Sequence, residues 1–209
     1  MQFDFQRIHI VGGPGSGKST FARSLGKKLG APVYDLDTIA FQGKDFLERP
    51  VEQRLADAHA IAIQPRWITE GIFVGWIDEL LRAADVILWL DTLPWQQAAW
   101  RILLRFARNG LREVLRQRGR NKFFRFGDYR RNLGQLRDVL ISSRAYYHDS
   151  VPPVNGDIRN ITRAETAAYL ADYMSKVIHF QTHQEVESFI ANLNSRNSQE
   201  QEFAHSLSV

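Results

Sequence analysis

Residues 12–20 of this chain read Gly-Gly-Pro-Gly-Ser-Gly-Lys-Ser-Thr, and they constrain the fold more than any other stretch. A glycine, four intervening residues and then Gly-Lys-Ser form the spacing of a phosphate-binding loop. An apolar run over residues 8–11 precedes the loop, and Phe21, Leu25 and Leu29 recur every four residues after it. This pattern predicts a strand before the loop and a helix from residue 18 to residue 29, closed by Gly30.

The loop residues predict a nucleotide site. Glycines let successive backbone N–H groups turn toward a polyphosphate, and the start of the following helix adds partial positive charge. We assign Lys18 to the outer phosphates and the Ser19 hydroxyl to a magnesium ion, so the expected cofactors are ATP and Mg²⁺. The residues expected to contact the nucleotide are Gly13, Pro14, Gly15, Ser16, Gly17, Lys18, Ser19 and Thr20.

Length and composition limit the class of protein. With 209 residues the chain can bury the core of one domain, and the absence of cysteine excludes disulfides and cysteine-ligated metal sites. Apolar runs such as residues 86–90 are too short to span a bilayer. We expect one domain over residues 1–194, a flexible polar tail over residues 195–209, a cytoplasmic location and no membrane partner.

Acidic residues follow the predicted strands. Asp35 and Asp37 end the second strand, Glu70 ends the third and Asp91 follows the fourth. Because the carboxyl ends of parallel strands meet at one edge of an α/β sheet, these carboxylates should lie near the bound phosphates. We predict Ser19, Asp35, Glu70 and Asp91 as metal-site residues and Asp37 as the group that orients or deprotonates an acceptor hydroxyl. Two alternatives stay open: Asp37 caps the next helix, or Asp91 is only a turn residue.

Pro94 begins a predicted helix with arginines along one face. Arg101, Arg105, Arg108 and Arg112 are spaced by four, three and four residues, with no acid between them. The planar guanidinium suits bidentate phosphate contacts, so we predict Arg101 and Arg105 as catalytic residues that neutralise a transferring phosphoryl group. The alternative is a solvated helix face.

Basic charge is concentrated in one segment. The net charge of the chain is +4, whereas residues 101–137 contain twelve Lys or Arg against two acids. Residues 108–132, with interleaved Phe and Tyr and interrupted by glycines at 119 and 127, are predicted to form a basic lid that closes over ATP. The same composition describes a nucleic-acid surface, and the sequence does not separate the two.

The remaining segments give weaker signals. Residues 50–64 predict a helix with Val51, Leu55, Ala58 and Ala62 on its buried face, and a helix is predicted from residue 133 to residue 148. Residues 38–49 show no clear pattern; in this segment, Phe41 and Phe46 either contact the acceptor or pack in the core.

Two capping boxes flank the predicted fifth strand, residues 177–180. They begin at Thr162 and Thr182, each followed three residues later by glutamate. The loop at Thr182 and His183 follows the last strand, where we expect the adenine of ATP. The first box should begin a helix to about residue 174, and the second a helix to about residue 193.

The ordered motifs resemble the adenylate-kinase-related P-loop kinases, over about residues 7–194. The resemblance rests on the phosphate-binding loop, Glu70-Gly71, and the run from Asp91 to Pro94 followed by Arg101 and Arg105. Most similar are the small kinase-like DNA topology modulation proteins. The resemblance implies binding of ATP and Mg²⁺, with Lys18, Ser19, Arg101 and Arg105 handling phosphate.

Differences from these families bear on the acceptor. Asp37-Thr38 stands where adenylate kinases have their monophosphate-binding Leu-Arg pair, which argues against AMP as the acceptor. The run from Tyr34 to Asp37 is similar to shikimate and gluconate kinases, although the glycine triplet of shikimate kinase is missing after the third strand.

The sequence therefore predicts a three-layer α/β P-loop NTPase fold with a five-stranded parallel sheet in the order 2-3-1-4-5 and a basic helical lid. The predicted function is transfer of the γ-phosphate of ATP to a small hydroxyl- or phosphate-bearing acceptor near Asp37. A nucleotide-dependent nucleic-acid-binding regulator is the alternative from another class. Neither the acceptor nor the oligomeric state follows from the sequence.

Overall fold

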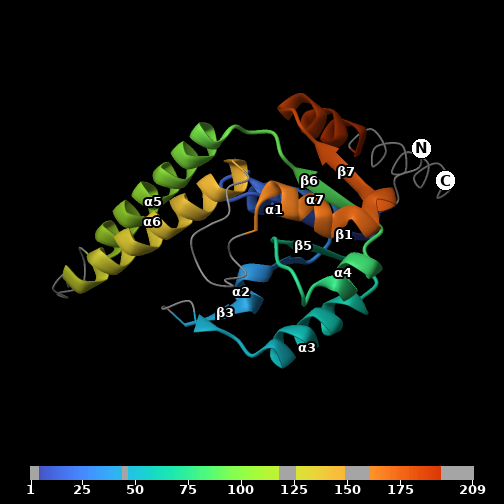
Figure 1. The fold of residues 1–209 in the computed structure, drawn as a ribbon, viewed down its shortest axis with the longest axis horizontal. Coiled ribbons are helices and arrows are strands. Elements are labelled where there is room, and N and C mark those ends of the chain that lie inside the picture. Colours follow the sequence, from blue (N-terminus) through green and yellow to red (C-terminus); the bar gives the residue numbers. More distant parts are fainter. Residues whose placement is uncertain (1–4, 44–46, 118–125, 149–160, 194–209) are drawn as a thin grey trace, which may run out of the picture.

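A computed structural model of the chain describes residues 5–43, 47–117, 126–148 and 161–193, with side chains described outside residues 112–132. Its central sheet is parallel and runs in the order β2, β5, β1, β6, β7 (Figure 1). These strands are Val33–Asp35, Trp67–Glu70, Arg7–Gly12, Val86–Leu90 and Val177–Phe180. Numbered along the chain within this sheet, the order is 2-3-1-4-5, so the predicted topology is confirmed.

Helices cover both faces of the sheet. They are α1 (Lys18–Leu29), α2 (Leu36–Ala40), α3 (Val51–Ala62), α4 (Asp78–Ala83), α5 (Trp95–Gln117), α6 (Phe126–His148), α7 (Arg163–Leu170), the 3-10 helix η1 (Ala171–Lys176) and a helix over residues 183–193. Side chains alternate along the strands, as the two-residue period requires. In β6, for example, Leu88 packs with α1 and the 183–193 helix, whereas Ile87 packs with α3, α4 and α7. The result is the three-layer α/β fold of the P-loop NTPases.

Local sequence signals place several helix ends correctly. Helix α1 runs from Lys18 to Leu29, and Gly30 ends it in the left-handed region, with φ of 61° and its N–H bonded to the Gly26 carbonyl oxygen. The Thr162 hydroxyl accepts from the Glu165 N–H at 3.1 Å, and the Glu165 carboxylate accepts from the Thr162 N–H at 2.8 Å. These ends depend on contacts within one turn, which is why the sequence reveals them.

Helices α5 and α6 form a long pair that projects from one side of the sheet (Figure 1). Helix α6 begins at Phe126 and contains Gly127, so the predicted interruption at Gly127 and the predicted helix start at residue 133 are wrong. One glycine costs a helix only about 1 kcal/mol, which strong helix formers on either side can offset. The central lid residues 118–125 lie outside the described residues, as do Phe46 and the predicted tail.

Two further predictions need correction in the segment after β2. The second strand stops at Asp35, and residues 36–40 form α2; a short antiparallel hairpin, β3 (Phe41–Gln42) and β4 (Leu47–Glu48), follows. The buried face of α3 consists of Arg54, Ala58, Ile61 and Ala62, whereas Val51 and Leu55 are exposed. Helix α3 is therefore rotated relative to the predicted orientation, and an arginine takes an inward position.

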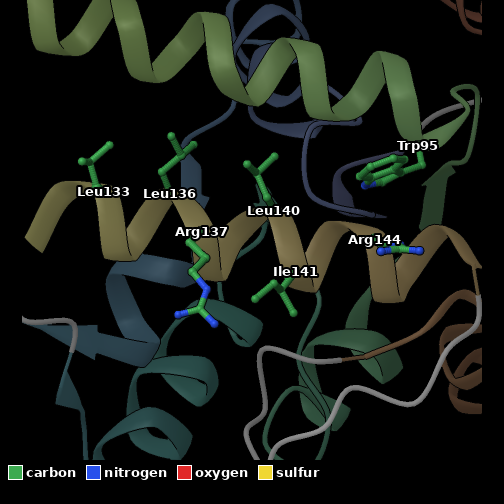
Figure 2. A pocket seen from close by; sticks show the side chains of 7 residues that line it. All are labelled: Trp95, Leu133, Leu136, Arg137, Leu140, Ile141 and Arg144. Carbon is green, nitrogen blue, oxygen red and sulfur yellow. The ribbon is translucent and has the colours of Figure 1, made fainter. Parts of the chain in front are cut away.

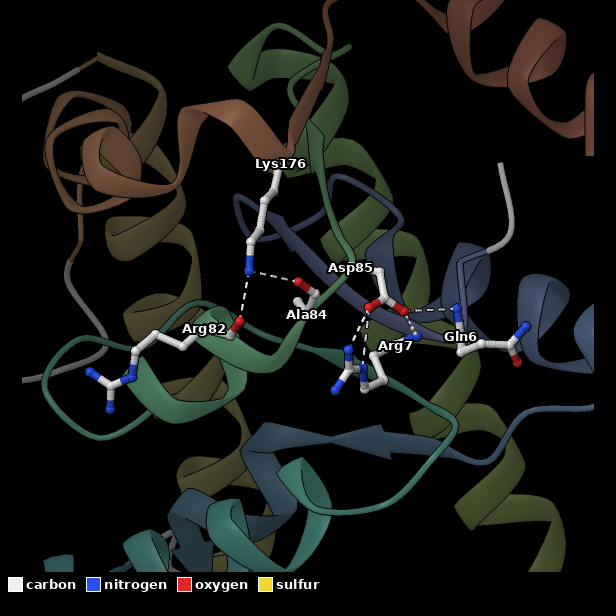
Figure 3. Close-up of polar contacts among 6 residues, drawn as sticks. All are labelled: Gln6, Arg7, Arg82, Ala84, Asp85 and Lys176. Carbon is white, nitrogen blue, oxygen red and sulfur yellow. Dashed lines mark hydrogen bonds and ion pairs between the residues drawn. The ribbon is translucent and has the colours of Figure 1, made fainter. Parts of the chain in front are cut away.

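A polar clamp holds the amino-terminal edge of the sheet (Figure 3). Asp85 accepts from the backbone N–H groups of Gln6 and Arg7 at 3.0 and 2.8 Å and from the Arg7 guanidinium at 2.7 Å. Desolvation opposes ionisation of Asp85, but the hydrogen bonds from Arg7 and Gln6 outweigh it and lower the pKa of this carboxyl group. Lys176 Nζ donates to the carbonyl oxygens of Arg82 and Ala84 at 2.7 and 3.0 Å. These contacts join β1, α4 and η1 at the edge opposite the phosphate-binding loop.

None of the helices in the described part of the chain is both long enough and apolar enough to cross a bilayer.

Candidate active site

The phosphate-binding loop joins β1 to α1 in the predicted context. Gly15 and Gly17 have φ angles of 84° and 99°, in the region that favours glycine. No side chain caps α1, and its first turn contains no acid. The buried Ser16 Oγ has no hydrogen-bond partner among the described atoms. A helix start without a cap and an unsatisfied hydroxyl fit a bound phosphate group.

The loop is pressed between two helices that come from far along the chain. A Cβ on Gly13 would lie 2.4 Å from the ring of Tyr146, and a Cβ on Gly15 would lie 2.6 Å from the Ala98 carbonyl oxygen. Ser143 Oγ donates to the Pro14 carbonyl oxygen at 3.4 Å. Glycine is therefore required at these positions for packing as well as for approach to a phosphate.

Glu70 lies beside the loop residues that were predicted to handle phosphate and metal. Desolvation raises the pKa of Glu70, while Lys18 and a hydrogen bond from Ser19 lower it, and Asp35 and Asp37 raise it further. This set of electrostatic partners shows that the structure brings together Lys18, Ser19, Glu70, Asp35 and Asp37, as expected for the carboxyl edge of a parallel sheet.

Asp35 and Asp37 have different roles in the local structure. The Asp35 side chain caps α2 by accepting from the Asp37 N–H at 3.0 Å, so the cap of this helix is Asp35 and not Asp37. Desolvation raises the pKa of Asp37, and Asp35 raises it too, whereas Lys18 and Arg105 lower it. Asp37 is exposed to solvent, so a second substrate can reach it.

The two predicted catalytic arginines reach different parts of this centre. Arg101 Nη1 lies 3.5 Å from the Ser16 carbonyl oxygen and 3.5 Å from the position of a Cβ on Gly17. Arg105, one turn further along α5, acts electrostatically on Asp37. Arg101 therefore contacts the loop, whereas Arg105 acts on the carboxylate of Asp37.

Asp91 has other partners. Its carboxylate pairs with Arg163 at 3.0 Å and with His179 at 3.4 Å, and it is not among the groups that act on Glu70 or Asp37. The His179 ring stacks on Trp89 with centroids 4.0 Å apart. These contacts tie the end of β6 to β7 and α7, and the metal role of Asp91 stays a prediction.

Thr182 and His183 lie at the start of the 183–193 helix and are exposed. The Thr182 hydroxyl accepts from the Glu185 N–H at 3.3 Å, which confirms the second capping box. His183 lies 3.9 Å from Glu187 on the helix surface. Nothing in these contacts tests a role in adenine binding, which stays a prediction.

A separate apolar groove runs along α6 and lies away from the acidic centre. Leu133, Leu136 and Leu140 point toward α5, whereas Arg137 and Ile141 point away from it (Figure 2). The Arg144 guanidinium lies 5.8 Å from the centre of the Trp95 ring at one end. No carboxylate among the described residues lines this groove, so it offers no general base for phosphoryl transfer. We therefore place the candidate active site at the phosphate-binding loop.

Sequence reasoning missed two buried pairs of side chains, one against the phosphate-binding loop and one at α3. Tyr146 accepts from Trp89 Nε1 at 3.0 Å and covers Gly13, and burial raises its pKa to about 12. Arg54 and Trp76 meet beside α3, at 5.9 Å from guanidinium to ring centre. For Arg54 and Trp76, the only signal in the sequence was an arginine beside apolar residues in the predicted helix over residues 50–64.

The described residues contain no group of three or more His, Asp and Glu side chains arranged to hold a metal ion. Magnesium commonly keeps several waters and binds through one or two carboxylates and substrate phosphates. Ser19, which acts on the pKa of Glu70, fits such a partial site together with Glu70, and Asp35 is the register partner of Glu70 in the sheet.

No protein-family model matches this chain. Among curated proteins, an 86-residue segment is 31% identical to the uncharacterized protein YqaC of Bacillus subtilis (strain 168). The match covers 41% of this chain and 48% of YqaC, so it spans about half the length of that relative. The narrower resemblance to the DNA topology modulation proteins stays a prediction.

Several solved structures are similar to this chain at low scores. A shikimate kinase from Acinetobacter baumannii in complex with shikimate is 16% identical, with a TM-score of 0.38, over 83% of this chain and 96% of that one. A gluconokinase from Sinorhizobium meliloti 1021 is 14% identical, with a TM-score of 0.38, over 81% and 93%. The fold assignment rests on the sheet order and the loop, not on these scores.

Proposed function

We propose that this protein is a P-loop kinase that transfers the γ-phosphate of ATP to a small acceptor. The observation that carries the proposal is the set of charges around Asp37, a solvent-accessible carboxylate near the carboxyl ends of β2 and β5. A desolvated carboxylate with a raised pKa lies within electrostatic reach of both Lys18 and Arg105. Asp37 is thus a candidate general base, and two cations that suit phosphate, Lys18 and Arg105, act on it beside the phosphate-binding loop.

Each residue of the site has its own role in the proposed reaction. The loop amides and Lys18 hold the phosphates of ATP, and Arg101 and Arg105 neutralise charge on the transferring group. Ser19 and Glu70, with Asp35 near them, would hold a magnesium ion, which supplies further charge neutralisation when bound. Asp37 orients the acceptor hydroxyl and accepts its proton as the acceptor oxygen bonds to the γ-phosphorus. The bond to the β–γ bridging oxygen breaks, and ADP leaves.

Acceptor-dependent ATP consumption tests this proposal. The purified chain is incubated with ATP and Mg²⁺ and a panel of nucleosides, nucleotides, sugars and small acids, and ADP release and phosphorylated product are measured together. We expect ADP release to rise only with particular acceptors and to match product formation. ATP binding without turnover for any acceptor would contradict a kinase, and tight ATP-independent binding to DNA would favour the regulatory alternative.

A further inference from the structure

Helix α3 buries a charge where its sequence offers apolar side chains. Arg54 is 9% exposed, whereas Val51 and Leu55 on the same helix are 41% and 46% exposed. Burying a side chain such as leucine stabilises a fold by about 1.5–3 kcal/mol, and burying a charge without a partner is costly. Burying Arg54 while Val51 and Leu55 stay exposed therefore lowers the stability of the fold relative to the opposite orientation of α3. Such a cost is expected where a residue serves function.

The Arg54 side chain has a long ion pair and no hydrogen bond among the described residues. Glu48 Oε2 lies 4.0 Å from Arg54 Nη2, beyond hydrogen-bond distance, and the Glu48 side chain is 43% exposed. Arg54 Nε is buried and has no hydrogen-bond partner. Arg49 provides the contrast, because its Nη1 donates to Asp57 at 2.6 Å and to the Ile39 carbonyl oxygen at 3.0 Å.

A second buried donor without a hydrogen-bond partner among the described residues belongs to the ring that Arg54 lies over, that of Trp76. Trp76 is 2% exposed, and its Nε1 is buried without a partner. The Arg54 guanidinium carbon lies 5.9 Å from the centre of the Trp76 ring. Two buried side chains that only donate hydrogen bonds, one of them charged, match the oxygens of an anion.

Aromatic contacts link these donors to the catalytic edge of the sheet. The ring centres of Trp76 and Phe73 are 5.1 Å apart, and those of Phe73 and Phe41 are 6.2 Å apart. A Cβ on Gly71, which directly follows Glu70, would lie 3.1 Å from the Phe73 ring. The donor pair therefore lies on the side of the acidic centre formed by α2, α3 and the loop after β5.

We propose that Arg54 and Trp76 bind an anionic group, a carboxylate or a phosphate, on the acceptor whose hydroxyl group faces Asp37. This inference rests on the proposed function and defines its substrate class as small hydroxyl-bearing anions. Because Arg54 and Glu48 are 4.0 Å apart, the anion of the acceptor can replace Glu48 at the guanidinium without breaking a short ion pair. Glu48 then competes weakly with that anion.

The test uses inorganic phosphate and benzoate as probes, and their binding is measured by thermal melting and by tryptophan fluorescence. Because phosphate also binds the phosphate-binding loop, every measurement is made on the full chain with Lys18→Ala. We expect either probe to raise the melting temperature and change the fluorescence, and Arg54→Met to weaken binding at least tenfold. Arg54→Met should melt no lower than its parent without the probes, since it removes a buried charge whose ion-pair partner Glu48 lies 4.0 Å away and stays solvated.

Three variants keep the result interpretable. Arg23→Met removes the same charge from an exposed position on α1 and should leave both responses unchanged. Glu48→Gln should tighten probe binding, because it removes the competing carboxylate. Arg54→Lys keeps the charge without the planar fork and should bind with intermediate affinity. A response that persists in Arg54→Met, or no response in the parent, overturns the inference, as does a large loss of stability with probe binding retained.

The acceptor panel separates this inference from the proposed function. Arg54→Met should raise KM for anionic acceptors at least tenfold while leaving ATP affinity unchanged. If the probes bind through Arg54 but no acceptor is phosphorylated, the anion site stands and the kinase assignment fails. If turnover occurs with full efficiency in Arg54→Met, the kinase assignment stands and the anion site fails. The probe with the larger Arg54-dependent response distinguishes carboxylate from phosphate.

Discussion

The ring of Tyr146 occupies the space that a side chain on Gly13 would need, with Cδ1 2.4 Å from the ideal Cβ position. Tyr146, near the end of α6, thus packs directly against the phosphate-binding loop and leaves no room for a side chain at Gly13. The Tyr146 hydroxyl is held in turn by Trp89 of β6. The loop therefore responds to changes in α6 although the two are far apart in the sequence.

We predict that Gly13→Ala destabilises the protein by about 1–3 kcal/mol, the usual effect of overpacking a filled core. Gly110→Ala is the matched control, because nothing lies within 4 Å of its added methyl group and it lies inside α5. That control should stabilise the protein by about 0.5–1 kcal/mol. Urea unfolding of both variants provides the measurement, and equal effects would mean that Tyr146 does not confine the loop.

Lys18→Ala should abolish tight ATP binding without unfolding the protein. Lys18 is partly exposed at the start of α1, so it contributes charge to the phosphates and little to the core. Calorimetric titration with ATP gives the affinity, and a melting curve confirms the fold. Lys27→Ala in the last turn of α1 is the control for loss of one charge. Unchanged ATP affinity in Lys18→Ala would show that the loop is not a nucleotide site.

Asp37→Asn should lower turnover by roughly 10² to 10⁴, the usual contribution of a positioned general base, with ATP binding nearly intact. In the parent, kcat/KM should rise with pH through the raised pKa of Asp37, because the base must be ionised. Steady-state kinetics across pH give both results. Since Asp35 and not Asp37 caps α2, lost activity cannot be ascribed to a lost cap.

The same substitution should change how stability depends on pH. Desolvation raises the pKa of Asp37 above its ordinary value of 3.8, so the folded state binds this proton more tightly than the unfolded state does. The stability contribution of Asp37 is therefore lost as pH rises from 3.8 through the folded pKa. Asp37→Asn should be more stable than the parent near neutral pH, and the difference should disappear below pH 3.8. Urea unfolding at both pH values measures this, with exposed Asp138→Asn on α6 as control.

Replacing Arg101 or Arg105 with lysine should reduce turnover while barely changing any affinity for DNA. Lysine keeps the charge but loses the planar fork that binds phosphate oxygens in pairs. Arg108→Lys, further along α5, should have a smaller effect on turnover. Salt-dependent DNA binding that needs no ATP, and that disappears when Arg116, Arg118 and Arg120 are replaced together, would contradict the lid assignment.

Local sequence determined much of this protein. The loop from Gly12 to Thr20, the extent of α1 and both capping boxes follow from residues within one turn of each other. Alternating and continuous apolar runs identified all five strands of the sheet, and the carboxyl-edge rule placed Glu70 and Asp37 beside Lys18. Each of these features depends on short-range geometry or on a topological rule that holds for parallel sheets generally.

Only the tertiary structure decided which polar groups meet. Asp91 pairs with Arg163 and His179, from segments more than 70 residues away, and no local pattern near Asp91 indicates either partner. The rotation of α3 that buries Arg54 and exposes Leu55 depends on Trp76 and the neighbouring core, not on the periodicity of the helix. Such choices depend on the balance of burial and pairing between distant segments, which no local pattern contains.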